Sequence, residues 1–228
     1  MLMRKICFLF FAFAFLHTLP AAGQPVVVVD PAHGGNDGGV VINEKLKEKD
    51  INLKISLLLK RELEKSGRVR VVLTRDRDID RQIGERRKVI EDSHPAVVVS
   101  IHINRAFGRA AKGFELYYQG FKSKDKGKKK GPEAQHIIQS MQKTEYLNKS
   151  VLLSQKIQRH LGQVFPKEYR GLREAPIELI DSLAVPAVIV EIGFASNPEN
   201  LKKITDSKRQ EEIARALSRG ILESLEKR

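Results

Sequence analysis

The sequence predicts a single α/β domain, a mostly parallel twisted sheet with helices on both faces. Apolar runs rich in β-branched residues alternate along the chain with segments whose apolar residues recur every three or four positions. Such alternation of strands and helices is typical of parallel sheets. The four valines at 26–29 indicate a strand that is buried on both of its faces.

The expected elements follow from these patterns in chain order. Strands are expected at 26–30, 69–73, 96–101, 113–118 and 186–191, with a weaker one near 175–179. Helices are expected at about 50–66, 80–92, 144–162 and 207–226. Asp50 is expected to cap the first helix and Gly67 to end it, and Asn197 to cap a helix entered through Pro198. Apolar and polar residues alternate least regularly in the strand at 113–118, so we expect this strand at an edge of the sheet.

Three of the apolar strands end on a side chain that can bind a metal or move a proton. His33 lies in a glycine-rich loop after the first strand, His102 ends the third, and Glu191 ends the strand at 186–191. The carboxyl ends of parallel strands meet at one edge of a sheet, where ligands and catalytic groups collect. Charged groups are rarely buried there unless they are paired or coordinated. Two imidazoles and a carboxylate suit a zinc ion.

A catalytic zinc has three protein ligands and one open position, so a third ligand is needed. Glu44 and Glu48 both lie just before the first long helix. A glutamate at a helix entrance also interacts favourably with the helix dipole without binding any metal. Spacing alone does not decide between the two glutamates.

Five ordered motifs connect these residues to a known family. They read Asp30-Pro31-Ala32-His33-Gly34-Gly35, Glu48-Lys49-Asp50, Leu73-Thr74-Arg75-Asp76, Ser100-Ile101-His102-Ile103-Asn104 and Glu191-Ile192-Gly193-Phe194-Ala195-Ser196-Asn197-Pro198. In these motifs the chain resembles the catalytic domain of the zinc-dependent N-acetylmuramoyl-L-alanine amidases, which are bacterial cell-wall hydrolases. The resemblance covers roughly residues 26–225. Where Ala32 stands the family usually has glycine, and an alanine fits if its φ is negative.

The resemblance implies a site and a reaction. One zinc ion per chain would be held by His33, Glu48 and His102, with Glu191 as the catalytic glutamate. The bond cut would be the amide between the lactyl group of N-acetylmuramic acid and L-alanine of the peptidoglycan stem peptide. The alternatives are another exported zinc peptidase that cuts within the stem peptide, and a non-enzymatic basic wall-binding protein with a degenerate site.

The amino terminus predicts export to the periplasm or beyond, in association with the cell wall. Arg4 and Lys5 precede 11 apolar residues, and small residues follow near position 23. This pattern is typical of a signal peptide over 1–23, and a retained anchor is the alternative. Residues 24–228 would then be the catalytic domain, about 205 residues long. The one cysteine, Cys7, belongs to the leader, so structural disulfides are excluded from the mature chain.

The chain is strongly basic, with a net charge of +13 that falls to +11 without Arg4 and Lys5 of the leader. A basic loop is expected at about 119–135, and its lysines are Lys122, Lys124, Lys126, Lys128, Lys129 and Lys130. This loop is either a solvated surface segment or an electrostatic contact with an anionic wall or membrane surface. Nucleic acid is disfavoured as a partner, because aromatic residues are few and no recognition motif occurs.

Residues 119–150 form a longer connection than a strand and a helix need. Some relatives carry a helix in this half of the domain that covers the zinc until a protein activator removes it. Here the segment is lysine-rich, with one apolar patch at Ile137, Ile138 and Met141. A solvated loop is therefore favoured over an autoinhibitory one.

The remaining polar candidates have simpler interpretations. Asp30 and Asp37 are expected to organise the first loop through local hydrogen bonds. His94, His136 and His160 are expected away from the metal. Arg75 and Arg86 suit structural ion pairs and substrate contacts equally well.

Overall fold

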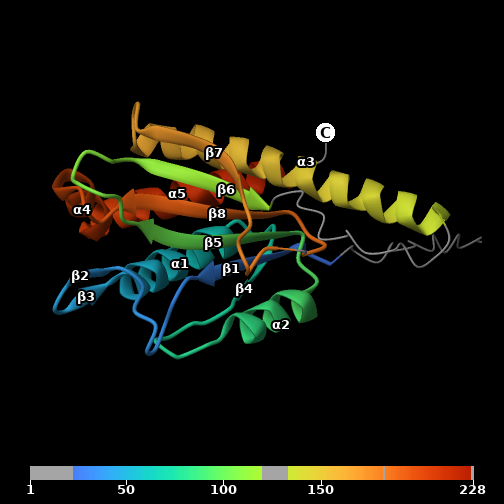
Figure 1. Ribbon diagram of the computed structural model, residues 1–228, viewed down its shortest axis with the longest axis horizontal. Coiled ribbons are helices and arrows are strands. Elements are labelled where there is room, and N and C mark those ends of the chain that lie inside the picture. The colour runs from blue at the N-terminus through green and yellow to red at the C-terminus, as the bar shows by residue number, and fades with distance from the viewer. Residues whose placement is uncertain (1–22, 120–132, 182, 227–228) are drawn as a thin grey trace, which may run out of the picture.

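The computed structural model describes residues 23–119, 133–181 and 183–226, which contain a six-stranded sheet in the order β4-β1-β5-β8-β6-β7 (Figure 1). The strands are β1 (Val26–Pro31), β4 (Arg70–Leu73), β5 (Val97–Asn104), β6 (Phe114–Gln119), β7 (Tyr169–Ala175) and β8 (Ala187–Phe194). β4, β1, β5 and β8 are parallel, whereas β6 runs antiparallel to β8 and parallel to β7. The predicted single α/β domain with a mostly parallel sheet is confirmed.

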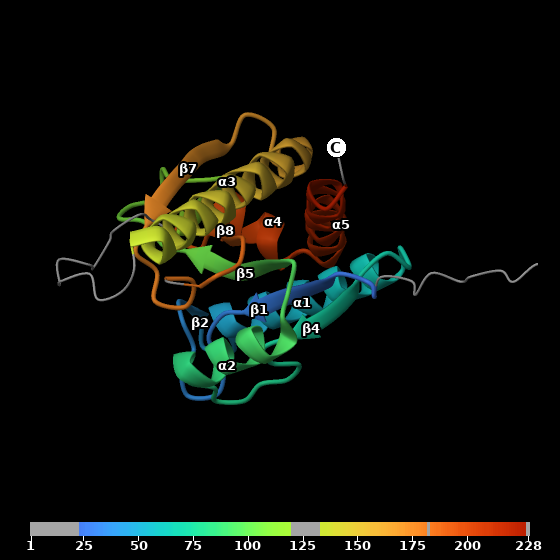
Figure 2. The same cartoon turned by 90° about the vertical axis from the view of Figure 1, so that its right-hand side faces the viewer.

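Helices cover both faces of this sheet. The helices are α1 (Glu48–Glu64), α2 (Ile83–Ser93), α3 (Glu133–Val164), α4 (Pro198–Thr205) and α5 (Ser207–Ser224). Apolar residues of α1, α3, α4 and α5 pack on one face in the larger core, which the alternate residues Val27 and Val29 of β1 join. Val28 points the other way, into a smaller core with Ile90 of α2 and residues of the segment that precedes β8. α2 and α3 accordingly lie on opposite sides of the domain (Figure 2).

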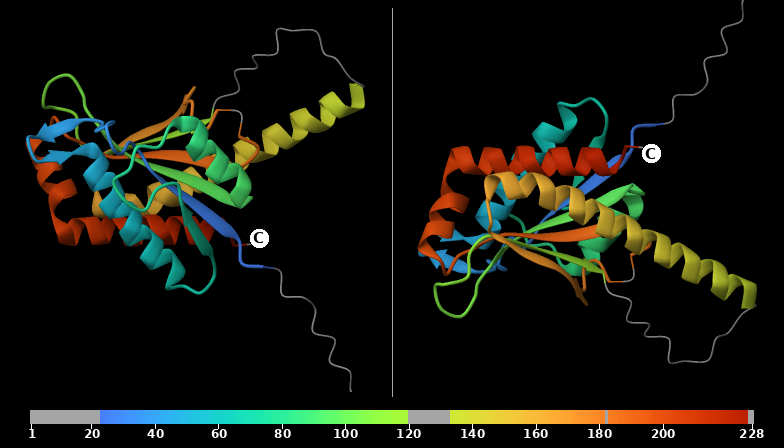
Figure 3. Two further views of the ribbon diagram at one scale, coloured as in Figure 1. Left: turned by 90° about the horizontal axis from the view of Figure 1, so that it is seen from below. Right: turned by 90° about the horizontal axis from the view of Figure 1, so that it is seen from above.

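Several expected boundaries are wrong. α3 begins at Glu133 rather than near 144, and its amino-terminal half projects past the strands (Figure 3). Ile137, Ile138 and Met141 are exposed there, so apolar periodicity did not reveal this half of the helix. The weak strand expected at 175–179 lies at Tyr169–Ala175, and it is this strand, not β6, that forms the edge. Partial exposure on both faces of β7 explains the weak pattern.

The entrance to α1 also differs from expectation. Lys47 is the N-cap, and Asp50 lies three residues inside the helix, where its carboxylate accepts the Lys47 N–H at 2.9 Å. A short hairpin of β2 (Val41–Asn43) and β3 (Leu46–Lys47) precedes the helix and was not expected. The predicted cap of α4 is confirmed, because Asn197 Oδ1 accepts the Asn200 N–H at 2.9 Å.

A buried carboxylate joins β1 to its neighbours. Asp30 accepts hydrogen bonds from Ser100 Oγ of β5 at 2.6 Å, from Arg86 Nη1 of α2 at 2.8 Å and from Thr74 Oγ1. Arg86 and Arg75 also donate to the Pro31 carbonyl, at 2.9 and 2.8 Å. Both arginines are therefore structural and hold the loop after β1. The partners of Asp30 lie 44 to 70 residues further along the chain, in β5, in α2 and just after β4, so the expected local role for this residue is wrong.

We expect Arg86→Ala to lower the free energy of unfolding by about 3–5 kcal/mol, since it leaves Asp30 buried without its counter-charge. The side chains of this pair are only 6% and 2% exposed. Urea denaturation followed by circular dichroism measures the change. Lys88→Ala is the matched control on the same helix: Lys88 pairs with Asp92 at the surface, and its loss should change stability by no more than about 0.5 kcal/mol. Equal losses in both variants would contradict the role of the buried pair.

The contribution of the Asp30–Arg86 pair to the free energy of unfolding should also depend on pH. Burial alone would raise the pKa of Asp30, but Arg86 and the hydroxyls of Ser100 and Thr74 hold it below its ordinary value. A depressed carboxyl pKa gives stability that is present above the unfolded value of about 3.9 and is lost as the pH falls through the folded value. The difference in the free energy of unfolding between wild type and Arg86→Ala should therefore become smaller in acid, because a protonated Asp30 needs no counter-charge.

Candidate metal centre

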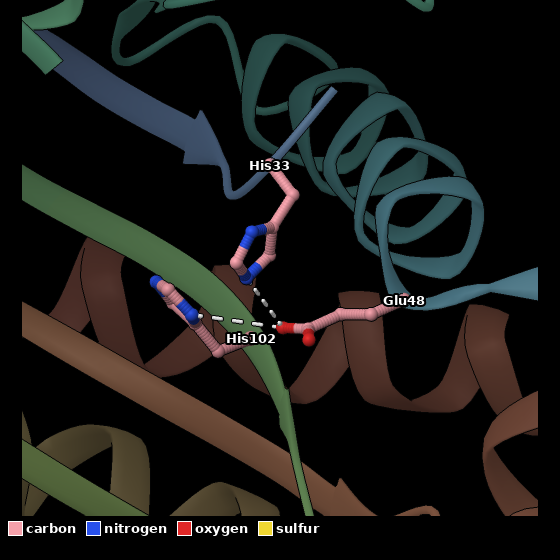
Figure 4. A group of neighbouring side chains, drawn as sticks. All are labelled: His33, Glu48 and His102. Atoms are coloured by element: carbon pink, nitrogen blue, oxygen red, sulfur yellow. Dashed lines mark ion pairs between the residues drawn. The ribbon is translucent and has the colours of Figure 1, made fainter. Parts of the chain in front are cut away.

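The first side chain of the site, His33, lies in the loop after β1. Its backbone has φ 63°, in the left-handed region that is unusual for a residue other than glycine. Arg86 Nη2 and the loop hydrogen bonds hold it there, since the guanidinium donates to the His33 carbonyl. Nδ1–H donates to Asp37 Oδ2 at 2.7 Å, as expected for a local role of Asp37. The ring is thereby turned so that Nε2 faces Glu48 Oε1 at 3.3 Å (Figure 4).

His102 approaches the same carboxylate from β5. Its Nδ1 lies 3.6 Å from Glu48 Oε1, and its Nε2 lies 3.1 Å from Ser100 Oγ. Because Ser100 donates its own proton to Asp30, its oxygen accepts the Nε2–H of His102. The buried chain Asp30–Ser100–His102 therefore leaves the lone pair on Nδ1, the atom that faces Glu48. Such partners beyond the ligands fix ring orientation and tautomer in metal sites.

Glu48 occupies the first position of α1 and is only 2% exposed. The backbone N–H of Val40 donates to its Oε2 and the backbone N–H of Ile103 to its Oε1, each at 2.9 Å. At Gly39, which has φ 64°, a Cβ would lie 2.6 Å from Glu48 Oε2, so only glycine allows the loop to pass this close. Glu44 instead lies exposed in the turn of the β2–β3 hairpin.

One ligand atom from each of His33, Glu48 and His102 lies within 4.8 Å of the others. Two imidazoles and one carboxylate are the donor set of many catalytic zinc sites with an open position. The three residues thus form a group that could bind a metal ion, drawn from a loop, a helix start and a strand (Figure 4).

The electrostatics of the group favour a positive charge. Burial alone would lower the pKa of His33, but Glu48 and Asp37 raise it to about 9. Burial alone would raise the pKa of Glu48, but His33 and the backbone donors lower it to about 2. Burial lowers the pKa of His102, which keeps its ring neutral, as a metal ligand must be.

Glu191 lies beside the metal-binding group on β8, directly paired with His102 of β5. Burial, with further contributions from Glu48 and Glu115, raises its pKa to about 8. Its Oε2 is buried and makes no hydrogen bond within the described residues. The strand register places Glu191 beside His102, and His102 lies with His33 and Glu48, so the four predicted site residues gather near the carboxyl ends of β1, β5 and β8.

A cavity of about 310 Å³ opens beside His33 and His102. Its lining also includes Gln82 and Ile83 at the start of α2 and the segment 177–179. Of the other histidines, His94 ends α2 with φ 44° and His160 contacts Glu223 at 3.0 Å, away from the metal as expected. The side chain of His136 lies outside the described part of the structure.

One feature of the site was missed by sequence reasoning. Ser100 belongs to an apolar strand and gives no signal of its own, although its two-residue spacing from His102 places both on one face. The expectation for Ala32 is confirmed: its φ is not positive, so an alanine fits where the family usually has glycine.

Comparison with known proteins gives a consistent result. The family model described as N-acetylmuramoyl-L-alanine amidase matches residues 27–223. The germination-specific N-acetylmuramoyl-L-alanine amidase of Bacillus subtilis is 26% identical, with 90% of this chain and 81% of that protein covered.

Solved structures show the same fold. The catalytic domain of CwlV, an N-acetylmuramoyl-L-alanine amidase from Bacillus (Paenibacillus) polymyxa var. colistinus, has a TM-score of 0.73 at 28% identity, covering 89% of this chain and 98% of that one. The CwlD amidase from Clostridioides difficile, solved in complex with the GerS lipoprotein, has a TM-score of 0.72 at 29% identity, covering 89% and 98%. Sequence, fold and site geometry together place this chain in the N-acetylmuramoyl-L-alanine amidase family.

Proposed function

We propose that this protein hydrolyses the amide between the lactyl group of N-acetylmuramic acid and L-alanine of the peptidoglycan stem peptide. The observation that carries the proposal is the convergence of His33, Glu48 and His102 beside Glu191, in a chain of the amidase family. The cavity beside the two histidines gives a substrate access to them.

The residues present fit one zinc ion per chain, held by His33 Nε2, His102 Nδ1 and Glu48. Zinc bound there would lower the pKa of water and polarise the carbonyl of the substrate. Asp37 and the pair Asp30–Ser100 would hold the two imidazoles in the tautomers that this requires.

Glu191 is the proposed general base and then acid. Its buried Oε2 has no other described hydrogen-bond partner, so it is free to accept a proton from the attacking water. It would return that proton to the nitrogen of L-alanine as the amine leaves. A raised pKa favours this second step, since a protonated carboxyl must be available to donate. The first step needs the carboxylate, which the positive charge of a zinc ion bound nearby would favour.

The place of action is proposed from the leader. Residues 1–22 lie outside the described residues, and a signal peptide over 1–23 with a catalytic domain from 24 to 228 stays a prediction. No helix in the described ranges is both long and apolar enough to cross a membrane. The basic segment at 120–132 also lies outside the described residues. Electrostatic contact of its lysines with an anionic surface, or autoinhibition by this region, therefore remains a hypothesis. A protein activator is supported by the lipoprotein complex of the CwlD relative.

Digestion of purified sacculi tests the function and its metal. We expect mass spectrometry to find released peptides that begin with L-alanine and glycan strands with free lactyl groups. A stem-peptide peptidase would release shorter fragments instead, and a wall-binding protein would release nothing. Chelation and dialysis should abolish release and zinc should restore it. Full activity of metal-free protein would contradict the proposed site.

A further inference from the structure

A row of side chains crosses the sheet from the metal centre to its edge. His102 of β5 is paired with Glu191 of β8, and Glu191 is paired with Glu115 of β6. Directly paired residues of neighbouring strands point to the same face. β7 is the next strand and forms the edge. The row therefore leads from the metal ligands, past the proposed general base, to β7.

Glu115 is a buried carboxylate whose two oxygens are both engaged. Oε1 accepts Arg170 Nε at 2.8 Å and lies 3.5 Å from Arg173 Nη2. Oε2 accepts the Tyr117 hydroxyl at 2.7 Å. The Glu115 side chain is only 4% exposed. Glu115 therefore lies at the bottom of a small cluster of side chains, and its carboxylate cannot itself reach a ligand in solvent.

A β-bulge in β7 places both Arg170 and Arg173 over the Glu115 carboxylate. Residues three apart in a regular strand point to opposite faces. Here Phe114 is paired with Tyr169 and Leu116 with Leu172, so Glu115 alone faces both Arg170 and Gly171. Gly171 has φ 121°, a conformation that favours glycine. The extra residue brings Arg170 and Arg173 to the same carboxylate, and bulges that re-aim side chains often lie next to active sites.

The two guanidinium groups of the cluster are partly exposed to solvent. Both pair with the same carboxylate, that of Glu115, so these three side chains together carry a net positive charge. The two arginine side chains are 39% and 53% exposed, for Arg170 and Arg173 respectively. Arg170 is also held in place over the ring of Phe194, with 5.1 Å between its Cζ and the ring centroid. A fixed, forked cation of this kind recognises carboxylates.

In the substrate of the proposed function, a free carboxylate can lie only on the peptide side of the amide that is cut. The single carboxyl group of N-acetylmuramic acid is consumed in the amide that is cut. Negative charge close to that bond therefore lies on the peptide. β7 lies two strand spacings from Glu191, about 10 Å. An extended peptide advances about 3.3–3.6 Å per residue, so about three residues span the distance to the β7 backbone. The guanidinium groups reach back to Glu115 of β6, about one strand spacing nearer, so the second residue past the scissile bond comes within their reach.

We propose that Arg170 and Arg173 form a carboxylate-binding subsite for the stem peptide, next to the residue that follows L-alanine. This inference rests on the proposed function, since it takes the amide on the L-alanine nitrogen as the bond that is cut. Arg173 is the more exposed and more weakly paired of the two, so it makes the larger contribution to specificity. Arg170 and Glu115 position it.

Two soluble muramoyl peptides test the subsite with the zinc-loaded full chain. They differ only in whether the residue after L-alanine carries a free carboxylate or a carboxamide. We expect the wild type to prefer the carboxylate by about tenfold in kcat/KM, a modest value for a hydrogen bond to a charged group. Arg173→Gln should abolish this preference through KM, and leave kcat/KM for the carboxamide within about twofold. Arg173→Lys, which keeps the charge but not the fork, should restore part of the preference.

The control is Arg68→Gln, which removes an exposed arginine from the turn after α1 and should leave the preference unchanged. A wild type that treats both peptides equally would overturn the subsite, as would an Arg173→Gln variant that loses activity equally on both. Each of these results would leave the proposed function standing. A wild type that cuts neither peptide at the lactyl amide would overturn the proposed function and the subsite together.

Discussion

Glu191→Gln should lower hydrolysis of peptidoglycan by about 10²–10⁴-fold, the contribution expected of a general acid–base. Glutamine keeps the shape of this side chain of β8 but cannot accept the proton of the attacking water. Metal content should stay at one ion per chain, because the ligand atoms of His33, Glu48 and His102 are untouched. Release of muropeptide fragments gives the rate, and elemental analysis gives the metal.

Two controls make this result specific. Glu44→Gln removes an exposed carboxylate in the β2–β3 turn and should leave both rate and metal content unchanged. Glu191→Gln with near wild-type activity would remove this residue from the mechanism. An inactive Glu191→Gln that has also lost its metal would instead make Glu191 a ligand, and the assignment of Glu48 would have to be revised.

The site was predictable because each of three of its side chains follows an apolar run, although the expected strand ends at 101 and 191 are wrong. β5 continues past His102 to Asn104, and β8 continues past Glu191 to Phe194, so both side chains lie inside their strands. His33, His102 and Glu191 each follow a run that reads as a buried strand, and parallel strands align their carboxyl ends. Glu48 was not predictable from spacing, since it competes with Glu44 four residues away. What selects Glu48 is the Ile103 N–H, which comes from a strand 55 residues further along the chain. Local patterns carry no information about such a contact.

The β7 edge of the sheet was also unpredictable from local sequence patterns. β7 is polar, half exposed and kinked by a bulge at Gly171, so its residues show no alternation. Its pairing partner, β6, was expected at the edge for similar reasons. β6 lies inside the sheet because β7 covers it, and Glu115 is buried there because two arginines of β7 neutralise it. The burial of that carboxylate is a property of the pair of strands.

His102→Ala should lose metal and activity together. The substitution removes one of three ligand atoms and leaves His33 and Glu48, which are too few to hold zinc in a catalytic site. Activity should fall below detection, and no metal should remain after dialysis against a weak chelator. His160→Ala removes a histidine that contacts Glu223 instead and should leave metal content unchanged. Retention of one zinc ion by His102→Ala would place the metal elsewhere.

A milder variant tests the proposal that His102 binds the metal through Nδ1. Ser100→Ala keeps every ligand but removes the oxygen that accepts Nε2–H, so the ring loses its preferred tautomer. Loss of such a partner typically lowers metal affinity by about 10–100-fold, which competition with a chromogenic chelator measures. Asp30 must then keep its remaining contacts to Arg86 and Thr74, so the fold should survive. An unchanged affinity in a folded Ser100→Ala protein would mean that the strand alone orients His102. A loss of affinity would show that the buried carboxylate of β1 acts on the metal centre through Ser100.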